Sequence, residues 1–404
     1  MNEQRRAVLQ SDALLGDDER ALRQVVTAFA DEVIAPASYE ANRTRTLPIG
    51  IVRQMGELGL YGLPFPEAVG GQGGGYMAFC LAVEAIARVD QSIAITLDAG
   101  VGLGAMPLLR FGSAAQQQRW LPDLLAGRTL AAFGLTEPEA GSDAGATRTR
   151  AALEGGEWVI NGSKQFITNS GTPITSLVTV TAVTGERTRP DGRPGKELSA
   201  IIVPSGTPGF TVGPAYDKLG WHASDTHPLA FENARVPAEN LLGERGRGYA
   251  GFLAMLDEGR IAIAALAAGA ALGCLEQALA YTNNQTIFDS PLGTRQHIAF
   301  MIAGMQARVH TAQLAWQHAA RLRDAGLPFK AEAAIAKLVA GEAAMANARE
   351  ATQIFGGNGF MNEFVVARHY RDSKVLEIGE GTTEVQLMVI ARELGLQAEA
   401  EHHG

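Results

Sequence analysis

The sequence ARHYRDSKVLEIGEGTTEVQLMVIARELG, residues 367–395, decides how the rest of the chain is interpreted. Apolar residues at helical spacing on both sides of a glycine-containing break predict a helix, a tight loop and a second helix. In the first helix we expect Tyr370 to face the core and Arg368 to face solvent. The second helix is expected to begin at Thr383, with Gln386 three residues on completing a capping box. The pattern therefore places a short loop between two anchored helices.

The loop between these helices carries one acid, Glu380, which is flanked by Gly379 and Gly381. An isolated acid beside a helix start is most often a solvated surface residue. The two glycines, however, let the backbone and hence a ligand come close, because neither neighbour has a side chain. From these residues alone a solvated acid is the more frequent case, and a catalytic base is the alternative.

The composition favours a multidomain protein without nucleic-acid, metal or membrane-spanning features. The chain has 404 residues, 46% of them hydrophobic, so it can bury a large core and is expected to form two or three domains. Its net charge of -9 argues against nucleic-acid binding. Cys80 and Cys274 lie in apolar stretches and are predicted to be buried free thiols, and the histidines do not cluster at ligand spacing. The N-terminus has no apolar signal region and the longest apolar run, 261–274, is too short to span a bilayer, so we expect a cytoplasmic protein.

The character of the sequence changes twice along the chain. Ala-rich and amphipathic segments up to residue 128 predict helices. Short runs rich in Thr, Val, Gly and Pro then predict antiparallel strands up to about residue 242, and long helical periodicity returns afterwards. We therefore expect an α+β multidomain fold, with an N-terminal α-helical domain at 1–128, a middle β-barrel-like domain at 129–242 and a C-terminal four-helix-bundle-type domain at 243–404.

The run from Arg368 to Gln386 resembles the C-terminal signature of the acyl-CoA dehydrogenases, and the helix–sheet–helix order resembles their fold over essentially the whole chain. The resemblance implies FAD as cofactor, an acyl-CoA thioester as substrate and α,β-desaturation as the reaction. In medium- and short-chain members the acid of the E-G-T run removes the α-proton of the thioester, and Glu380 falls on that acid. An electron-transfer flavoprotein is the implied electron acceptor.

Two further stretches resemble motifs of that family that line the flavin. The turn FGLTEPEAGSD, residues 133–143, matches a family signature whose backbone and side chains contact the flavin and the CoA arm. The strand GSKQFITNS, residues 162–170, carries an aromatic residue that packs on the flavin ring and a Thr that donates to its N5 atom. Read without the family, these are an ordinary turn and an ordinary strand. The residues implied are Phe133, Leu135, Thr136, Ser142, Phe166, Ile167 and Thr168.

The stretch LDEGRI, residues 256–261, is expected to begin a long helix and, by resemblance, to contact the substrate. The resemblance assigns acyl-CoA contacts to Asp257 and Arg260, and Gly381 joins them from the loop. Other branches of the family place their catalytic Glu immediately before the Arg, where this chain has Gly259. Glu258 lies about 100° round the helix from that position, so the base role stays with Glu380.

The last group of candidates is expected to hold FAD, in part from a neighbouring subunit. The run QIFGGNG, residues 353–359, is a glycine-capped helix end in the plain interpretation, and in the family it binds the adenosine and pyrophosphate of FAD on the adjacent chain. A shared site implies an obligate homo-oligomer, a tetramer before a dimer. The residues implied in cofactor binding are Gln285, Phe288, Gln296, Gln353, Phe355, Gly356, Gly357, Thr382 and Glu384.

The sequence departs from the family pattern at four positions, one of which is Leu387, where an Arg is common. Gly379 replaces the usual Tyr and removes a ring from the pocket wall, which would admit a branched or cyclic acyl group. Gln285 replaces the Arg that meets the FAD pyrophosphate, and Asp289 adds an acid nearby, which weakens the expected hold on FAD. Three alternatives therefore stay open: an acyl-CoA oxidase or flavin monooxygenase-like member of the same fold, a non-catalytic subunit of a hetero-oligomer, and a carrier-protein thioester as substrate.

Overall fold

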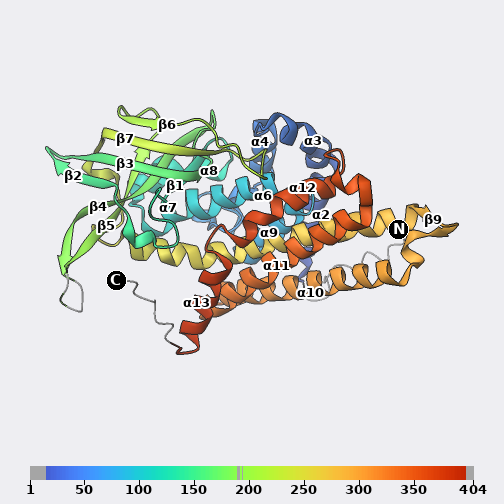
Figure 1. Cartoon of the computed structure of the whole chain (residues 1–404). Coiled ribbons are helices and arrows are strands. Elements are labelled where there is room, and N and C mark those ends of the chain that lie inside the picture. The colour runs from blue at the N-terminus through green and yellow to red at the C-terminus, as the bar shows by residue number, and fades with distance from the viewer. Residues whose placement is uncertain (1–14, 189–191, 193, 397–404) are drawn as a thin grey trace.

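The computed structural model describes residues 15–188, 192 and 194–396, and arranges them in three parts along the chain (Figure 1). A helical part comes first, a β-sheet follows, and long helices complete the molecule. The outer ends of the predicted first and last domains, residues 1–14 and 397–404, lie outside the described residues.

The first part packs its helices around α5, which is buried from Tyr76 to Ala87. A helix that is apolar on every side is stable only inside a core, and this one packs against α2, α6, α9 and α10. After α6 the chain continues through a π-helical segment, Ala99–Ala105, directly into α7. The helices are α2 (Asp17–Phe29), α3 (Ala35–Thr44), α4 (Ile49–Glu57), α5 (Gly75–Ala87), α6 (Gln91–Asp98), α7 (Met106–Phe111) and α8 (Ala114–Leu125).

The middle part is one eight-stranded sheet with strand order β6-β7-β3-β2-β4-β5-β8, and β1 pairs in parallel with β4. Its central strands are long and rich in β-branched residues, which suit a pleated, half-buried surface. The sheet has its own apolar core, which includes Trp158, Ile201 and Phe231. The strands are β1 (Leu130–Gly134), β2 (Arg150–Glu154), β3 (Glu157–Thr168), β4 (Thr175–Thr188), β5 (Pro194–Pro204), β6 (Phe210–Val212), β7 (Thr226–Pro237) and β8 (Leu241–Leu242).

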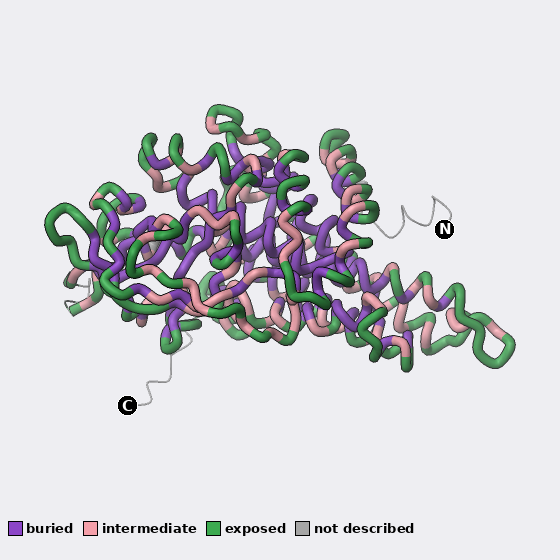
Figure 2. Tube along the Cα trace, turned by 90° about the horizontal axis from the view of Figure 1, so that it is seen from above, coloured by how far each residue is buried: buried purple, intermediate pink, exposed green. Residues whose placement is uncertain are grey.

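The last part is a helical bundle built on α9, which is 37 residues long. The alanines of α9 let α5, α10 and α11 approach closely, and one apolar core joins these helices to those of the first part. Between α9 and α10 a short hairpin projects at the end of the molecule opposite the sheet (Figures 1 and 2). The elements are α9 (Gly248–Asn284), β9 (Thr286–Ile287), β10 (Ser290–Pro291), α10 (Gln296–Asp324), α11 (Lys330–Phe355), α12 (Val365–Ser373) and α13 (Thr383–Glu393).

Two helical segments are long and apolar enough to cross a membrane by length and composition alone. They are Gln91–Phe111 and Gly251–Asn284, and 83% and 89% of their most apolar windows are buried inside the protein. The same test is passed by the core helices of proteins that lie outside membranes. Their burial accounts for their apolar composition, because both segments pack in the shared helical core.

Two details of the quoted C-terminal stretch are wrong in the sequence-based prediction. Arg368 is buried and donates from Nη2 to the Val89 carbonyl at 2.7 Å, whereas Tyr370 is 44% exposed. The cap of α13 is Thr382, whose hydroxyl accepts from the Val385 N–H at 3.3 Å. No capping box therefore forms on Thr383, and the amide of Gln386 is free to bind the loop instead.

Candidate active site

The loop that carries Glu380 is held rigidly from two sides. Glu380 and Gly381 both have left-handed backbone conformations, with φ of 54° and 91°. The Gly381 carbonyl accepts from Gln386 Nε2 at 2.8 Å and from Lys337 Nζ at 2.7 Å. A left-handed glutamate is rare and persists only where its surroundings fix it, so the loop holds Glu380 in one orientation.

The carboxylate of Glu380 points into the interior without a partner. Its Oε2 atom is buried and has no hydrogen bond in the described part of the chain. Burial raises the pKa of Glu380 above its ordinary value, while the charges of Arg260 and Lys337 act in the opposite direction. A desolvated, unpaired carboxylate with a raised pKa is suited to take up a proton.

Gly259 of α9 lies directly against this carboxylate. A Cβ atom built on Gly259 would come within 3.1 Å of Glu380 Oε2. Any side chain at residue 259 would therefore crowd the Glu380 carboxylate. Glycine at this position leaves the space next to the carboxylate open. The neighbouring Glu258 is engaged elsewhere, since its carboxylate pairs with Arg110 and with Arg323, the latter at 3.2 Å.

The two predicted substrate residues on α9 form an ion pair with each other. Arg260 is 6% exposed and pairs with Asp257, which is half-buried. Burial raises the pKa of Asp257, and Arg260 counteracts this shift. Arg260 also acts electrostatically on Glu380, so this pair lies beside the predicted base.

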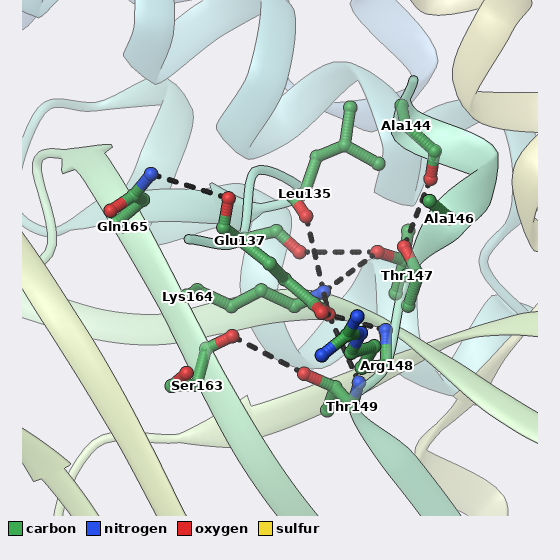
Figure 3. A network of polar contacts seen from close by, with 12 residues as sticks. Leu135, Glu137, Ala144, Ala146, Thr147, Arg148, Thr149, Ser163, Lys164 and Gln165 are labelled. Carbon is green, nitrogen blue, oxygen red and sulfur yellow. Dashed lines mark hydrogen bonds and ion pairs between the residues drawn. The ribbon is translucent and has the colours of Figure 1, made fainter. Parts of the chain in front are cut away.

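The turn that follows β1 is anchored by a buried ion pair, which Figure 3 shows from close by. Lys164 Nζ lies 2.7 Å from Glu137 Oε1 and donates to the Leu135 carbonyl at 3.1 Å. Glu137 also accepts from the backbone N–H groups of Arg148, at 2.6 Å, and Thr149, at 3.1 Å. These bonds fix the turn to strands β2 and β3.

The predicted residues of this turn differ in how accessible they are. Leu135 and Thr136 are half-buried, and the Thr136 carbonyl accepts from the Gln165 N–H at 2.9 Å. Ser142 is exposed. Phe133 is 8% exposed, and its ring stacks on Phe252 of α9 with ring centroids 4.5 Å apart.

At the end of β3 the structure leaves an aromatic ring uncovered. Phe166 is 59% exposed and has a left-handed backbone with φ of 62°, and its ring lies 5.1 Å from the ring of Tyr216. Ile167 is buried and half-buried Thr168 follows it, with a hydroxyl that has no hydrogen-bond partner among the described residues. An exposed ring beside a free hydroxyl can stack on and donate to a flat ligand.

The remaining cofactor candidates fall into two places. Thr382 and the exposed Glu384 stand at the start of α13, near Glu380. The others gather around the projecting hairpin (Figure 1) and the end of α11, where Phe355 stacks on Tyr281 with ring centroids 4.0 Å apart. This second group consists of Gln285, Phe288, Gln296, Gln353, Phe355, Gly356 and Gly357.

Most of this second group, the hairpin group, is exposed to solvent, whereas Phe355 is only 7% exposed. Phe288 is 85% exposed with φ of 48°, and Cβ atoms built on Gly356 or Gly357 would meet nothing within 4 Å. Gln285 and Gln296 are exposed as well. Nothing within the described chain covers this surface, and the hairpin lies at the opposite end of the molecule from the sheet (Figure 2). Within one copy of the chain, the candidate residues near Glu380 and those of the hairpin group therefore do not lie together.

Three charged residues of these regions were missed from the sequence. Lys337 is the one cation in the apolar run 333–341, and Asp98 is a lone acid at the end of an apolar helix. Arg295, ten residues after Gln285, donates to the Ile287 carbonyl at 2.9 Å and lies 5.7 Å over the Phe288 ring. It places a cation beside the hairpin that begins after Gln285. For Lys337 and Asp98, the only signal in the sequence was a charged residue isolated in an apolar segment.

Models of the N-terminal, middle and C-terminal domains of acyl-CoA dehydrogenases match residues 16–128, 132–234 and 246–395. A probable acyl-CoA dehydrogenase of Bacillus subtilis is 45% identical over 94% of this chain and 98% of its own length. The chain belongs to the acyl-CoA dehydrogenase family. The recognition and fold class predicted from the sequence are thereby confirmed.

Other relatives agree with this assignment. The mouse mitochondrial short-chain specific acyl-CoA dehydrogenase is 41% identical over 94% of this chain and 90% of its own. The solved butyryl-CoA dehydrogenase of Megasphaera elsdenii is 40% identical, with a TM-score of 0.89 over 94% of this chain and 98% of its own. A chain from a study of the electron transferring flavoprotein of Acidaminococcus fermentans is 38% identical, with a TM-score of 0.90 over the same shares.

The cofactor of this acyl-CoA dehydrogenase is FAD, as predicted, and the chain is an oxidoreductase. A glutaryl-CoA dehydrogenase of Mycobacterium smegmatis solved in complex with FADH2 is 31% identical, with a TM-score of 0.90 over 96% of this chain and 97% of its own. The residues present fit such a group. The uncovered ring of Phe166 and the free hydroxyl of Thr168 suit a flavin ring, and the open glycines Gly356 and Gly357 leave backbone accessible to a phosphate.

Proposed function

We propose that this chain desaturates a short-chain acyl-CoA between its α- and β-carbons, with Glu380 as the base that removes the α-proton. The observation that supports this role most directly is the buried Oε2 atom of Glu380, which has no partner among the described residues and lies against Gly259. A single carboxylate held on a rigid loop, desolvated and unpaired, has the orientation and the raised pKa that a general base needs.

The residues around Glu380 have separate roles in this proposal. Bound FAD supplies the acceptor for the hydride that leaves the β-carbon. Phe166 would pack against the flavin ring, and the Thr168 hydroxyl would donate to it. The backbone N–H of Glu380, which has no hydrogen bond in the described chain, would donate to the thioester oxygen as negative charge develops there. Phe133, Leu135, Thr136, Ser142 and Ile167 would line the flavin and thioester region.

The substrate side of the proposal rests on α9 and on the loop. The Asp257–Arg260 pair and Gly381 would border the acyl-CoA thioester next to the base. The short-chain specific relatives support a short acyl group. A Cβ atom on Gly379 would meet only Val375 atoms, at 3.5 Å or more, so the pocket wall has room for a branch.

We also propose a homo-oligomer in which the hairpin group of one chain completes the FAD site of another. The two groups of candidate residues lie far apart within one chain, and the hairpin end exposes large apolar side chains. These are Phe288, 85% exposed, Phe300, 66%, and Phe360, 87%. Exposed apolar clusters of this kind mark protein interfaces. Gln285, Gln296, Gln353, Phe355, Gly356 and Gly357 would contact FAD across that interface, with Thr382 and Glu384 at its other end.

The electron acceptor and the domain boundaries are also proposals. The relative from the Acidaminococcus fermentans study supports an electron-transfer flavoprotein as the physiological acceptor. Domain boundaries at 128/129 and 242/243 are supported by the change from helix to strand after α8 and back to helix before α9. The cytoplasmic location stays a prediction from the sequence.

Replacing Lys337 by Gln is expected to shift the acidic limb of the kcat/KM profile to higher pH. The Lys337 charge favours the ionised form of Glu380, so removing this charge raises the pKa of Glu380 further. The base is then ionised only at higher pH. Gln can still donate to the Gly381 carbonyl, and Lys337→Arg, which keeps the charge, is the matched control. An unchanged limb in the Gln variant would contradict an electrostatic role for Lys337.

The proposed function is tested by incubating the purified flavoprotein with butyryl-CoA and an electron-transfer flavoprotein under nitrogen. We expect a product two hydrogens lighter by mass spectrometry, formed without oxygen. Turnover that requires oxygen and consumes it stoichiometrically would instead identify an acyl-CoA oxidase. A protein that neither binds FAD nor converts any acyl-CoA would support the non-catalytic subunit.

A further inference from the structure

Asp98, at the end of α6, is a buried carboxyl group that the proposed reaction does not use. It is 5% exposed, and among the described residues it has neither a hydrogen bond nor an ion pair. Its helix continues directly into the π-helical segment Ala99–Ala105. Buried acids are normally paired, because an unsatisfied buried polar group is costly. An unpartnered one therefore indicates a missing ligand.

The space between Asp98 and the neighbouring Gly102 is not filled by other atoms. A Cβ atom built on Gly102 would meet only one atom within 4 Å, Asp98 Oδ1 at 3.7 Å. The Glu380 charge acts on Asp98, so the two carboxyl groups lie close enough to interact electrostatically. The helix α9 packs against α6 and also carries Gly259, which lies against Glu380. In the proposed function the thioester lies against Glu380, so the far end of its acyl chain would extend toward Asp98.

The protonation state of Asp98 limits what it can bind. Burial, and then the charge of Glu380, raise the pKa of Asp98 well above its ordinary value. The nearby cations Arg260 and Lys337 act on Glu380 and do not pair with Asp98 in the described structure. Burial therefore favours the neutral form of Asp98, a carboxylic acid with one O–H donor and a carbonyl acceptor. An aliphatic chain end satisfies neither group, whereas a hydroxyl satisfies both.

We propose that Asp98 recognises a hydroxyl group on the acyl chain, so that the enzyme prefers a hydroxyacyl-CoA to the unsubstituted acyl-CoA of the same length. This inference rests on the proposed function of the same site. A hydroxyl placed against Asp98 donates to its carbonyl oxygen and accepts from its O–H. A methyl group in that place leaves both polar atoms buried and unpaired, and a site built to bind a hydroxyl discriminates against an analogue that lacks it.

The test compares matched pairs of substrates in the wild type, in Asp98→Leu and in Asp98→Asn. The pairs are butyryl-CoA with 4-hydroxybutyryl-CoA, valeryl-CoA with 5-hydroxyvaleryl-CoA, and hexanoyl-CoA with 6-hydroxyhexanoyl-CoA. The quantity measured is the kcat/KM ratio within each pair. We expect the wild type to prefer the hydroxyacyl member of at least one pair by about 10- to 100-fold. Asp98→Leu should abolish or reverse that preference.

Asp98→Asn serves as the control for folding and for shape. Its amide still donates and accepts, so most of the hydroxyl preference should persist. A purely structural role for Asp98 would change both members of every pair equally and leave the ratios unmoved. Equal ratios in the wild type and Asp98→Leu, with unsubstituted chains still desaturated, would overturn this inference and leave the proposed function intact. Failure of both substrate series to react in the wild type would overturn the proposed function and this inference together.

Discussion

Glu380→Gln is expected to bind FAD and acyl-CoA but to turn over about 10²–10⁴ times more slowly than the wild type. The amide has nearly the shape of the carboxyl group, so the loop held by Lys337 and Gln386 should persist. It cannot accept the α-proton, however, and burial raises the pKa of Asp98, the acid on which Glu380 acts, so that Asp98 holds its own proton. Glu258, the nearest acid along α9, is paired with Arg110 and Arg323. Stopped-flow reduction of the flavin by butyryl-CoA measures the effect.

The control for this substitution is Glu377→Gln. Glu377 lies three residues before Glu380, and its carboxylate pairs with Lys374 at 2.6 Å. The same chemical change there should leave the rate of flavin reduction close to that of the wild type. Full activity in Glu380→Gln, or an equal loss in both variants, would remove Glu380 from the role of base.

Lys164→Met is expected to lower the free energy of unfolding by about 3–5 kcal/mol, because it leaves a charge without its partner in the interior. The side chains of Lys164 and Glu137 are 0% and 5% exposed and lie 2.7 Å apart. Burial lowers the pKa of Lys164 to about 8, whereas Lys164 and backbone donors lower the pKa of Glu137. These donors stabilise the charged carboxylate, so we expect the ionised pair near neutral pH. Urea unfolding followed by circular dichroism gives the change.

An exposed pair of the same type provides the comparison for Lys164→Met. Arg43 and Glu40 lie 2.6 Å apart, and both side chains are 59% exposed. Water screens such a pair, so Arg43→Met should have no resolvable effect on stability. The Lys164 variant should also release FAD more readily, since the turn between β1 and β2 loses its anchor (Figure 3). Equal stability of the two variants would contradict the account of the buried pair.

The sequence supported the family and the fold class because long, regular segments alternate in a recognisable order. The sequence predicted less accurately where individual helices begin and end. The cap of α13 falls on Thr382 because the chain leaves the left-handed Gly381 through an extended residue, with φ of -61° and ψ of 167° at Thr382. Two adjacent threonines offer the same hydroxyl, and only the backbone path selects between them. The site roles that follow from the family remain predictions.

Side chains that act across large sequence separations were the other source of error. Arg368 was expected in solvent because its helix is amphipathic, but its partner is the Val89 carbonyl, 279 residues away. Lys337 reaches the Gly381 carbonyl in the same way, from a different helix. Periodicity reports which face of a helix is apolar and does not report what a charge meets on that face. Such contacts became visible only in the folded structure.

The central claim is tested most directly by anaerobic addition of butyryl-CoA to the purified yellow protein. The account predicts that the visible flavin absorbance bleaches with about one equivalent of thioester per active site and that the α,β-unsaturated thioester forms. Glu380→Gln should stay yellow over the same period. A wild-type spectrum left unchanged by butyryl-CoA, and by longer, branched and hydroxylated acyl-CoAs, would contradict the assignment of this chain as a desaturating acyl-CoA dehydrogenase.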